Sequence, residues 1–332
     1  MTIPSNQVAN SRLSSLIPAL KRYVMSIDIK SLLYPLLGLF FFCLLWAYTA
    51  SQIDTSLGTF PGPAQVYAQA AVLVEEHQVE KQKAEAFYQR QEVRNAKKLE
   101  KKPDAKIKIR KYTGKETFFD QVLTSLKTVM FGFLIASLIA IPIGIVCGLS
   151  DGVYKAINPL IQIFKPVSPL AWLPLITMVV SAVYVSEDPW FEKAFLNSAF
   201  TVALCCLWPT LINTAVGVAN VDKDLLNVSR VIKLPALMHV RKIILPASIP
   251  MIFTGLRLSL ATGWMVLIAA EMLSQNPGLG KFVWDEFQNG SSDSLSRIMV
   301  AVVVIGLLGF ALDRLILLVQ RYVSWDKLAV LR

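Results

Sequence analysis

The segment LLNVSRVIKLPALMHVRKIILPASIP, residues Leu225 to Pro250, is a short basic loop between two long apolar runs. With the residues just before it, the loop carries more positive charge than its acidic residues, Asp222 and Asp224, can balance. Its basic side chains are those of Lys223, Arg230, Lys233, Arg241 and Lys242. Short loops with this charge lie on the cytoplasmic side of a membrane. The loop therefore sets the orientation of the runs on either side of it.

The first half of this loop has the pattern of a short amphipathic helix. Arg230 and Lys233 fall between apolar residues that recur at close to helical spacing. The apolar set is Val228, Val231, Ile232 and Leu234. Pro235 then ends or bends the helix, because proline lacks a backbone N–H and clashes with the preceding turn. A helix this short and charged cannot span a bilayer, so we expect its apolar side to contact protein.

The composition is that of a polytopic membrane protein. Of the 332 residues, 54% are hydrophobic and 17% are charged, whereas soluble domains carry about a quarter charged residues. The net charge of +10 follows from positive inner loops and one basic insertion, so we expect no nucleic-acid partner. The four cysteines lie in apolar runs and the two histidines in separate charged segments. The sequence therefore predicts no disulfide framework, no metal, no cofactor and no catalytic site.

Six charge-poor runs predict an all-α protein with six transmembrane helices. The expected domains are a cytoplasmic segment at 1–30, a first transmembrane helix at 31–53, an extracytoplasmic segment at 54–117, a five-helix core at 118–320 and a cytoplasmic tail at 321–332. The basic loop lies within the core, at 222–249. We expect no cleavable signal peptide in the first segment. Within the core we expect membrane helices at 128–150, 166–186, 194–221, 250–272 and 298–320, and a short cytoplasmic turn at 151–165. An even number of crossings places both termini in the cytoplasm.

The extracytoplasmic segment contains a charged insertion. From Glu75 to Glu116 it has thirteen Lys or Arg residues against eight Asp or Glu. A short helix is expected before it, at 64–74, whereas the insertion has too few apolar residues to bury a core and is expected to be a mobile helix or a disordered segment. Two interpretations are open: a solvated insertion without a further role, and an electropositive collar that holds an incoming anion or docks a soluble protein.

Small and polar residues mark the inner faces of the expected membrane helices. In the helix at 128–150 a stripe of small residues recurs every four positions and permits close helix contact. This stripe is Gly132, Ala136, Ala140, Gly144 and Gly148. Two ionisable residues, Arg257 and Glu271, lie about 21 Å apart in the helix at 250–272. Each either faces protein or water inside the membrane or lies at a headgroup layer, and the sequence leaves both positions open.

The spacing within the basic loop resembles that of the membrane subunits of ATP-binding-cassette (ABC) importers. Their cytoplasmic loop has the pattern E-A-A, three residues, Gly, nine residues, Ile, one residue, Leu-Pro. Here Asn227, Val228 and Ser229 stand at E-A-A and Lys233 stands at Gly, while Ile243, Leu245 and Pro246 match in register. The segments 253–257, 270–273, 166–174 and 208–214 resemble the branch that carries nitrate, nitrite, cyanate, bicarbonate, sulfonates and taurine, and within it the nitrate and bicarbonate members.

The resemblance implies the type I ABC importer permease fold, with a coupling helix in the loop at 222–249. It implies partners as well: two ATPase subunits, a second permease copy in a homodimer, an extracytoplasmic solute-binding protein and the lipid of a bacterial inner membrane. On this basis the residues that contact the ATPases are Asn227, Arg230, Lys233, Leu234, Pro235 and Met238. The candidate residues of the substrate pathway are Ser168, Trp172, Thr210, Asn213, Arg257 and Thr262.

Three classes of function are compared: a transport permease, a secondary transporter and a membrane-embedded enzyme. No G-x-x-x-x-G-K-[ST] nucleotide loop occurs, so a permease of this kind is expected to be non-catalytic and to rely on separate ATPases. A secondary transporter would be expected to carry more buried ionisable groups, and a membrane enzyme would need a nucleophile, metal or carboxylate set. The favoured cargo is nitrate or nitrite, with bicarbonate, sulfonate and taurine as alternatives.

Overall fold

The computed structural model describes residues 29–55, 58–101, 107, 109–185 and 190–323, and its secondary structure consists of helices and one two-stranded hairpin. The chain divides into two units, Met1–Tyr67 and Ala68–Arg332, which are described separately. The segment expected at 1–30 and the tail expected at 321–332 fall mostly outside the described residues. The helices are α2 (Ile29–Ala50), α3 (Pro63–Lys101), α4 (Phe118–Leu149), α5 (Asp151–Phe164), α6 (Pro169–Val183), α7 (Lys193–Ala219), α8 (Lys223–Val231), α9 (Ala236–His239), α10 (Leu245–Ser274), α11 (Leu279–Asn289) and α12 (Ser294–Val323), with a π-helical turn η1 (Val240–Ile244) before α10.

The first unit contains the first candidate membrane span. Its helix α2 is apolar and its described side chains are mostly exposed, as expected of a helix that faces lipid. After α2 the strands β1 (Asp54–Thr55) and β2 (Gly58–Thr59) pair antiparallel. Gly58 has a φ of 116°, a backbone conformation that only glycine adopts easily. This hairpin ends close to Pro63, where α3 begins.

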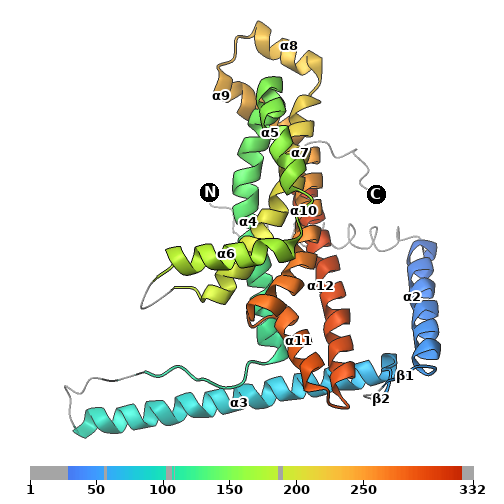
Figure 1. Cartoon of the computed structure of the whole chain (residues 1–332), viewed down its shortest axis with the longest axis vertical. Helices are drawn as coiled ribbons and strands as arrows, with labels where there is room; N and C mark the ends of the chain where they lie inside the picture. Colours follow the sequence, from blue (N-terminus) through green and yellow to red (C-terminus); the bar gives the residue numbers. More distant parts are fainter. Residues whose placement is uncertain (1–28, 56–57, 102–106, 108, 186–189, 324–332) are drawn as a thin grey trace, which may run out of the picture. The chain divides into compact units, whose positions relative to one another are not determined.

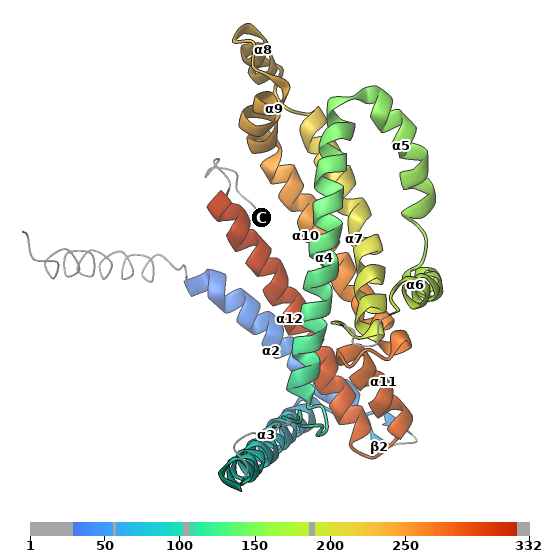
Figure 2. The ribbon, with the colours of Figure 1, turned by 90° about the vertical axis from the view of Figure 1, so that its left-hand side faces the viewer.

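Three long helices, α4, α7 and α10, form the centre of the second unit and lie side by side (Figures 1 and 2). The expected stripe of small residues on α4 is the surface that contacts α7. A Cβ atom at Gly144 would lie 2.8 Å from the Leu211 carbonyl oxygen, and one at Gly148 would lie 2.6 Å from that of Ala215. Because real Cβ atoms do not approach this closely, glycine at these positions lets the two helix backbones meet. The predicted packing role of the stripe is confirmed.

In place of the third expected membrane helix, at 166–186, the structure has a bent pair of helices. Residues 151–165, expected as a short cytoplasmic turn, form the 14-residue helix α5, and that prediction was wrong. Ser150 begins α5 by accepting a hydrogen bond from the Val153 N–H at 3.5 Å. Helices α5 and α6 together pass the length and hydropathy requirement for a span but meet at 101°. The prolines at 166 and 169 explain the break, since each lacks a backbone donor. In the described residues, five helices are long and apolar enough to cross a membrane, or six if this pair is one span.

The charged insertion forms the larger part of α3. The short helix expected at 64–74 continues without a break to Lys101, because Ala, Gln, Glu, Lys and Arg all favour helix formation. The described residues 109–117 are not helical and run along α3. The Tyr112 N–H donates to the Tyr88 hydroxyl at 3.1 Å, and the Tyr112 hydroxyl donates to Glu80 at 2.8 Å. These contacts hold the returning segment against the helix.

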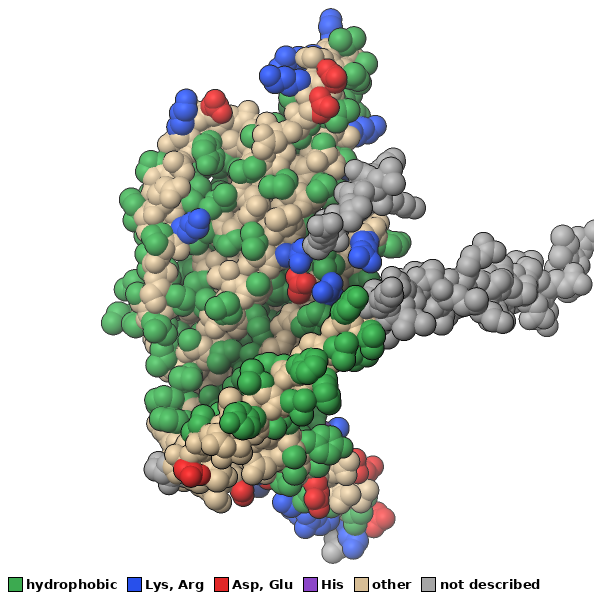
Figure 3. All heavy atoms as spheres, turned by 90° about the vertical axis from the view of Figure 1, so that its right-hand side faces the viewer, with side chains coloured by type: hydrophobic (Ala, Val, Ile, Leu, Met, Phe, Trp, Pro, Cys, Tyr) green, Lys and Arg blue, Asp and Glu red, His purple; other side chains and the backbone are tan. Residues whose placement is uncertain are grey.

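The loop at α8 and α9 and the helices α3 and α11 lie at opposite ends of the α4–α7–α10 bundle (Figures 1 and 2). On the face drawn in Figure 3, apolar side chains are spread along the bundle, and most charged side chains lie at its two ends, with fewer between them. This distribution suits a bundle whose middle faces lipid.

Candidate functional site

The basic loop is a helix–turn–helix, and its turn explains the glycine position of the family pattern. Helix α8 begins at Asp222, which accepts from the Asp224 N–H at 2.9 Å. At its end, the Lys233 N–H donates to Arg230 and the Leu234 N–H donates to Ser229, both at 3.2 Å. This pair of bonds is a Schellman motif, which requires a left-handed residue after the C-cap. Lys233 is that residue, with a φ of 50°.

This turn corrects the position at which the first helix ends. We expected Pro235 to end or bend it, whereas α8 stops at Val231 and Pro235 is the N-cap residue of α9. A hydrogen bond of 2.6 Å between Ser229 Oγ and His239 Nδ1 ties the two short helices together. Ser229 is 4% exposed. The loop is therefore a folded unit with a fixed angle between its helices.

Several large apolar side chains of the loop are exposed. Val231 and Leu237 are each 81% exposed, and both exceed the average exposure expected of large apolar side chains in a folded protein. Of the predicted contact residues, Asn227, Arg230, Lys233, Pro235 and Met238 are exposed and Leu234 is half-buried. Sequence analysis missed Leu237, because the register of α9 depends on the left-handed turn at Lys233.

A cavity of about 570 Å³ lies between the loop and the ends of α4 and α7 that are nearest to it. It is lined on the loop side by Arg230, Lys233 and His239, and on the bundle side by Gly148 and Val218. The lining is basic and contains no carboxylate. An acidic or carbonyl-rich edge of another chain would complement it.

Two of the predicted pathway residues lie at the start of α6. Ser168 is the N-cap residue, and its hydroxyl accepts from the Leu170 N–H at 3.3 Å. Trp172, one turn later, packs against Phe164 with ring centroids 5.7 Å apart. The tryptophan also lines a cavity of about 680 Å³ between α4, α6 and α7, whose walls are almost entirely apolar. Trp172 thus contributes an apolar wall rather than a hydrogen-bonding one.

The hydroxyl and amide side chains on α7 and α10 mostly form hydrogen bonds within or between these helices. Thr210 is fully buried and shares a hydrogen bond of 2.7 Å with Ser259 across the α7–α10 contact. The Asn213 amide donates to the Pro209 carbonyl of its own helix at 2.8 Å. Thr262 donates to the Leu258 carbonyl at 2.8 Å. Asn213 and Thr262 are both partly exposed.

Arg257 has a partner within the bundle. Its Nε donates to Asp313 Oδ1 at 2.9 Å, which joins α10 to α12. The two side chains are 31% and 36% exposed, so each charge is partly withdrawn from solvent or lipid. A charge inside a span needs such a partner. The pairing with Asp313 was not expected from the sequence, which places the two residues 56 positions apart.

Glu271 is fully buried and joins three helices. It accepts hydrogen bonds from Ser125 Oγ on α4 at 2.8 Å and from the Gly280 N–H in the first turn of α11 at 3.0 Å. The Leu279 N–H in turn donates to Ser125 at 2.8 Å. A carboxylate at the N-terminus of a helix accepts from free N–H groups and meets the positive end of the helix dipole. Of the two positions left open for Glu271, the structure selects the buried one.

The comparisons with known proteins agree with this architecture. Residues 140–325 match the family described as binding-protein-dependent transport system inner membrane component. The chain belongs to this family. The resemblance found in the loop spacing is therefore confirmed, and this chain is a permease, an inner-membrane component of a binding-protein-dependent transport system.

Individual relatives give the same result. The permease is 37% identical over 219 residues to the nitrate import permease protein NrtB of Synechococcus elongatus, an alignment that covers 63% of this chain and 75% of that one. It is 36% identical over 206 residues to the bicarbonate transport system permease protein CmpB of the same organism, covering 62% and 69% of the two chains.

A solved structure supports the fold. The inward-facing MetNI methionine ABC transporter aligns with a TM-score of 0.53 and 14% identity, over 62% of this chain and 96% of that chain. The predicted fold class, an all-α permease fold of ABC importers, is confirmed. None of these alignments covers the full length of this permease.

Proposed function

We propose that this permease forms the membrane pathway of an ATP-driven importer of a small inorganic anion, with nitrate or nitrite as the first cargo and bicarbonate as the second. The observation that carries the proposal is the similarity to NrtB, which spans 75% of that nitrate import permease. The similarity to CmpB is almost as high and keeps bicarbonate as the alternative. A sulfonate or taurine importer is the third possibility.

In the proposed mechanism, ATP is bound and hydrolysed by two separate ATPase subunits. The exposed apolar side chains of α8 and α9, Leu237 among them, seat each permease in a groove on an ATPase. One chain has one such loop, so two copies are needed to engage two ATPases, and a homodimer is the simplest closed assembly. Closure of the ATPases then swings the helices between inward-open and outward-open states, while a solute-binding protein delivers the anion from outside.

The proposed pathway uses weak contacts. Asn213 and Thr262 are partly exposed polar residues on α7 and α10, and the wall near Trp172 is apolar. Neutral hydrogen bonds contribute about 0.5 to 1.5 kcal/mol each, so such a lining passes an anion without trapping it. Thr210, which bonds to Ser259, and Arg257, which pairs with Asp313, then act by positioning the helices.

Transport by the reconstituted complex tests the proposal. Proteoliposomes that contain the permease and its ATPases, with the binding protein outside, are expected to accumulate labelled nitrate or nitrite only when ATP is present at the ATPases. Bicarbonate uptake without nitrate uptake would select the second cargo. Uptake of taurine or an alkanesulfonate, with neither of these anions, would contradict the proposed cargo.

Orientation is tested by labelling. We propose that both termini and the α8–α9 loop are cytoplasmic and that α3 is outside, supported by the positive charge of the loop and by the opposite ends at which the two lie. A single cysteine at Lys98 should react with a membrane-impermeant maleimide in intact cells, and one at Lys233 should react only after permeabilisation. The reverse pattern would overturn the orientation.

A further inference from the structure

The cavity between the basic loop and the ends of α4 and α7 is lined by cations without an acidic partner. Arg230 and Lys233 both line it, and among the described residues neither side chain forms an ion pair. The acidic residues of the loop, Asp222 and Asp224, lie at the start of α8, and neither lines the cavity. A concave site with two unpaired positive charges and no carboxylate attracts an anion.

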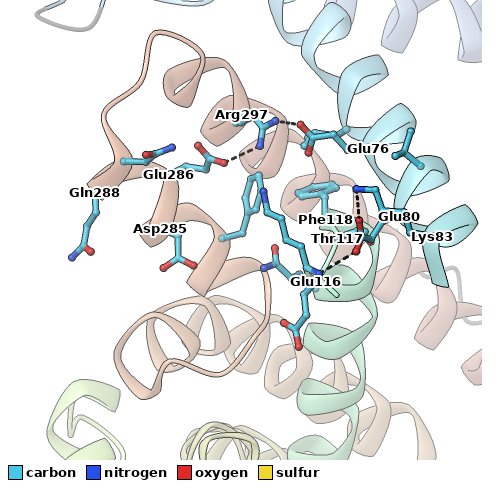
Figure 4. Close-up of a pocket in the computed structure, with 16 residues that line it drawn as sticks. Glu76, Glu80, Lys83, Glu116, Thr117, Phe118, Asp285, Glu286, Gln288 and Arg297 are labelled. Atoms are coloured by element: carbon cyan, nitrogen blue, oxygen red, sulfur yellow. Dashed lines mark hydrogen bonds and ion pairs between the residues drawn. The ribbon is translucent and has the colours of Figure 1, made fainter. Parts of the chain in front are cut away.

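A cavity of the same volume at the opposite end of the bundle, between α3, the start of α4 and α11, has a different pattern of charge (Figure 4). There Arg297 pairs with Glu76 and, at 3.1 Å, with Glu286 (Figure 4). Lys83 pairs with Glu80, also at 3.1 Å. The chain itself supplies the counter-charges of those cations. At the basic loop it supplies none, so a ligand is needed to balance Arg230 and Lys233.

The loop presents donors to this cavity from both of its short helices. The lining residues of α8 and its turn are Leu226, Ser229, Arg230 and Lys233, which stand at i, i+3, i+4 and i+7 and therefore share one face. His239 on α9 is held by the hydrogen bond of 2.6 Å between its Nδ1 and Ser229 Oγ. When the serine hydroxyl donates to Nδ1, the hydrogen of the neutral ring is on Nε2, which is left as a donor.

Lys233 occupies a position at which a side chain is costly. Its φ of 50° lies in the left-handed region, where the Cβ of an L-residue crowds the backbone. Strained backbone of this kind is concentrated at functional sites. The loop pattern of the ABC importers has glycine at this position, so a contact common to the family needs no side chain here. Docking of ATPases therefore does not account for the ammonium of Lys233.

A second departure from the loop pattern changes the charge in the same direction. Asn227 stands where the pattern has glutamate, so the loop lacks a negative charge at that position and gains a positive one at Lys233. Both departures raise the electrostatic potential around the cavity. The loop of this chain is thus better suited to an anion than the pattern from which it departs.

The donors select an oxyanion rather than a halide. A guanidinium offers parallel N–H groups that match two oxygens of one anion, and an ammonium adds a compact charge. A spherical anion cannot accept in this paired way. The carbonyl groups at the end of α8 do not oppose binding, because they accept from the N–H groups of Ile232, Lys233 and Leu234.

We propose that this cavity binds an oxyanion between Arg230 and Lys233 on one side and His239 on the other. The anion joins the two short helices of the loop and so holds the angle between them. Two sources have this chemistry: a free ion such as nitrate or inorganic phosphate, and the phosphate group of an anionic lipid. The binding does not depend on which solute the permease transports.

Calorimetric titration of the full-length permease tests the site. The permease is placed in nanodiscs of zwitterionic lipid, with and without its ATPases, and nitrate and inorganic phosphate are titrated separately in chloride buffer of constant ionic strength, so that screening is equal. Saturable binding of at least one of them is expected. Arg230→Gln and Lys233→Gln should each weaken it about tenfold or more, because each removes a charge-assisted hydrogen bond. Lys223→Gln is the matched control, since Lys223 is an exposed lysine of the same loop outside the lining, and its affinity should equal that of the wild type.

Lys233→Gly separates loss of binding from loss of folding. Glycine relieves the left-handed strain, so the loop should be at least as stable as in the wild type, yet the affinity should fall as in Lys233→Gln. Hydrogen–deuterium exchange over residues 226–240 gives a second readout. The anion should slow exchange in the wild type, because a ligand that binds only the folded loop stabilises it, and should have little effect in Lys233→Gly.

Nanodiscs that contain phosphatidylglycerol distinguish the two sources of the oxyanion. Weaker binding of the free ion in these discs than in zwitterionic ones, in the wild type but not in Lys233→Gly, assigns the cavity to a lipid phosphate, and equal binding assigns it to the free ion. Equal affinities for the wild type, Arg230→Gln and Lys233→Gly would overturn the proposal, as would a wild type without saturable binding in zwitterionic lipid. Binding that disappears when the ATPases are added would also overturn it and assign the cavity to an acidic edge of the ATPase.

Discussion

Lys233 carries a backbone conformation that suits glycine, and replacing it offers a direct test of the loop structure. With φ at 50°, its Cβ crowds the carbonyl that follows, a cost of about 1 to 2 kcal/mol for an L-residue. Glycine removes that cost but loses more conformational freedom on folding, by roughly 0.5 to 1 kcal/mol. Lys233→Gly should therefore stabilise the α8–α9 turn by about 0.5 to 1 kcal/mol.

That gain corresponds to an approximately two- to fivefold slower opening of the loop, since 1.4 kcal/mol is a factor of about ten. Hydrogen–deuterium exchange of peptides that cover residues 226–240, measured on the permease without ATPases, should report it as increased protection. The two turn bonds, from the N–H groups of Lys233 and Leu234, are the amides expected to respond most.

Two control variants separate strain from charge. Lys233→Ala removes the ammonium but keeps the Cβ, so its exchange should match the wild type. Lys233→Asn should lie between alanine and glycine, because asparagine tolerates the left-handed region better than other side chains. Exchange that is as fast in Lys233→Gly as in Lys233→Ala would refute the assignment of strain to this turn.

Three further predictions concern the site residues. Glu271→Ala leaves two buried donors without an acceptor and should lower the free energy of unfolding by about 2 to 4 kcal/mol; Glu271→Gln should lose less, and an unchanged melting temperature for both would disprove the joining role. Arg257→Ala should cost about 1 to 2 kcal/mol and slow transport, and the double replacement of Arg257 and Asp313 by alanine should recover most of the stability; no recovery would show that the arginine acts elsewhere. Leu237→Ala should weaken ATPase binding by about 2 kcal/mol or more, whereas the similarly apolar and exposed Leu318→Ala on α12 should not, and equal effects would argue against the loop as the interface.

Local patterns in the sequence were sufficient for the membrane helices. The hydropathy of each run and the small-residue spacing on α4 depend only on neighbours along one helix, and the structure places Gly144 and Gly148 against α7 as the spacing indicated. The basic loop was recognised from its charge and its Ile-x-Leu-Pro spacing, both of which lie within a few turns of the chain.

The sequence indicated only part of the structure around the break between α5 and α6. Proline at 166 and 169 indicated an irregular start of a helix, but the residues before them were assigned to a turn. The segment 151–164 has a strongly amphipathic pattern, with Ile161 buried in a cluster with Ala140 and Leu211. A short amphipathic helix next to prolines is ambiguous by local pattern, and its packing on α4 and α7 decides its form.

The sequence by itself determined the class of the protein, the positions of most spans and the location of the basic loop, because these follow from composition and short-range periodicity. Only the tertiary structure decided which polar groups meet. Ser125 and Glu271 are 146 positions apart, and Arg257 and Asp313 are 56 apart. Whether such residues meet depends on how each helix is rotated and shifted along its axis relative to its neighbours. Side-chain packing across the whole bundle sets this arrangement, and no local sequence pattern encodes it.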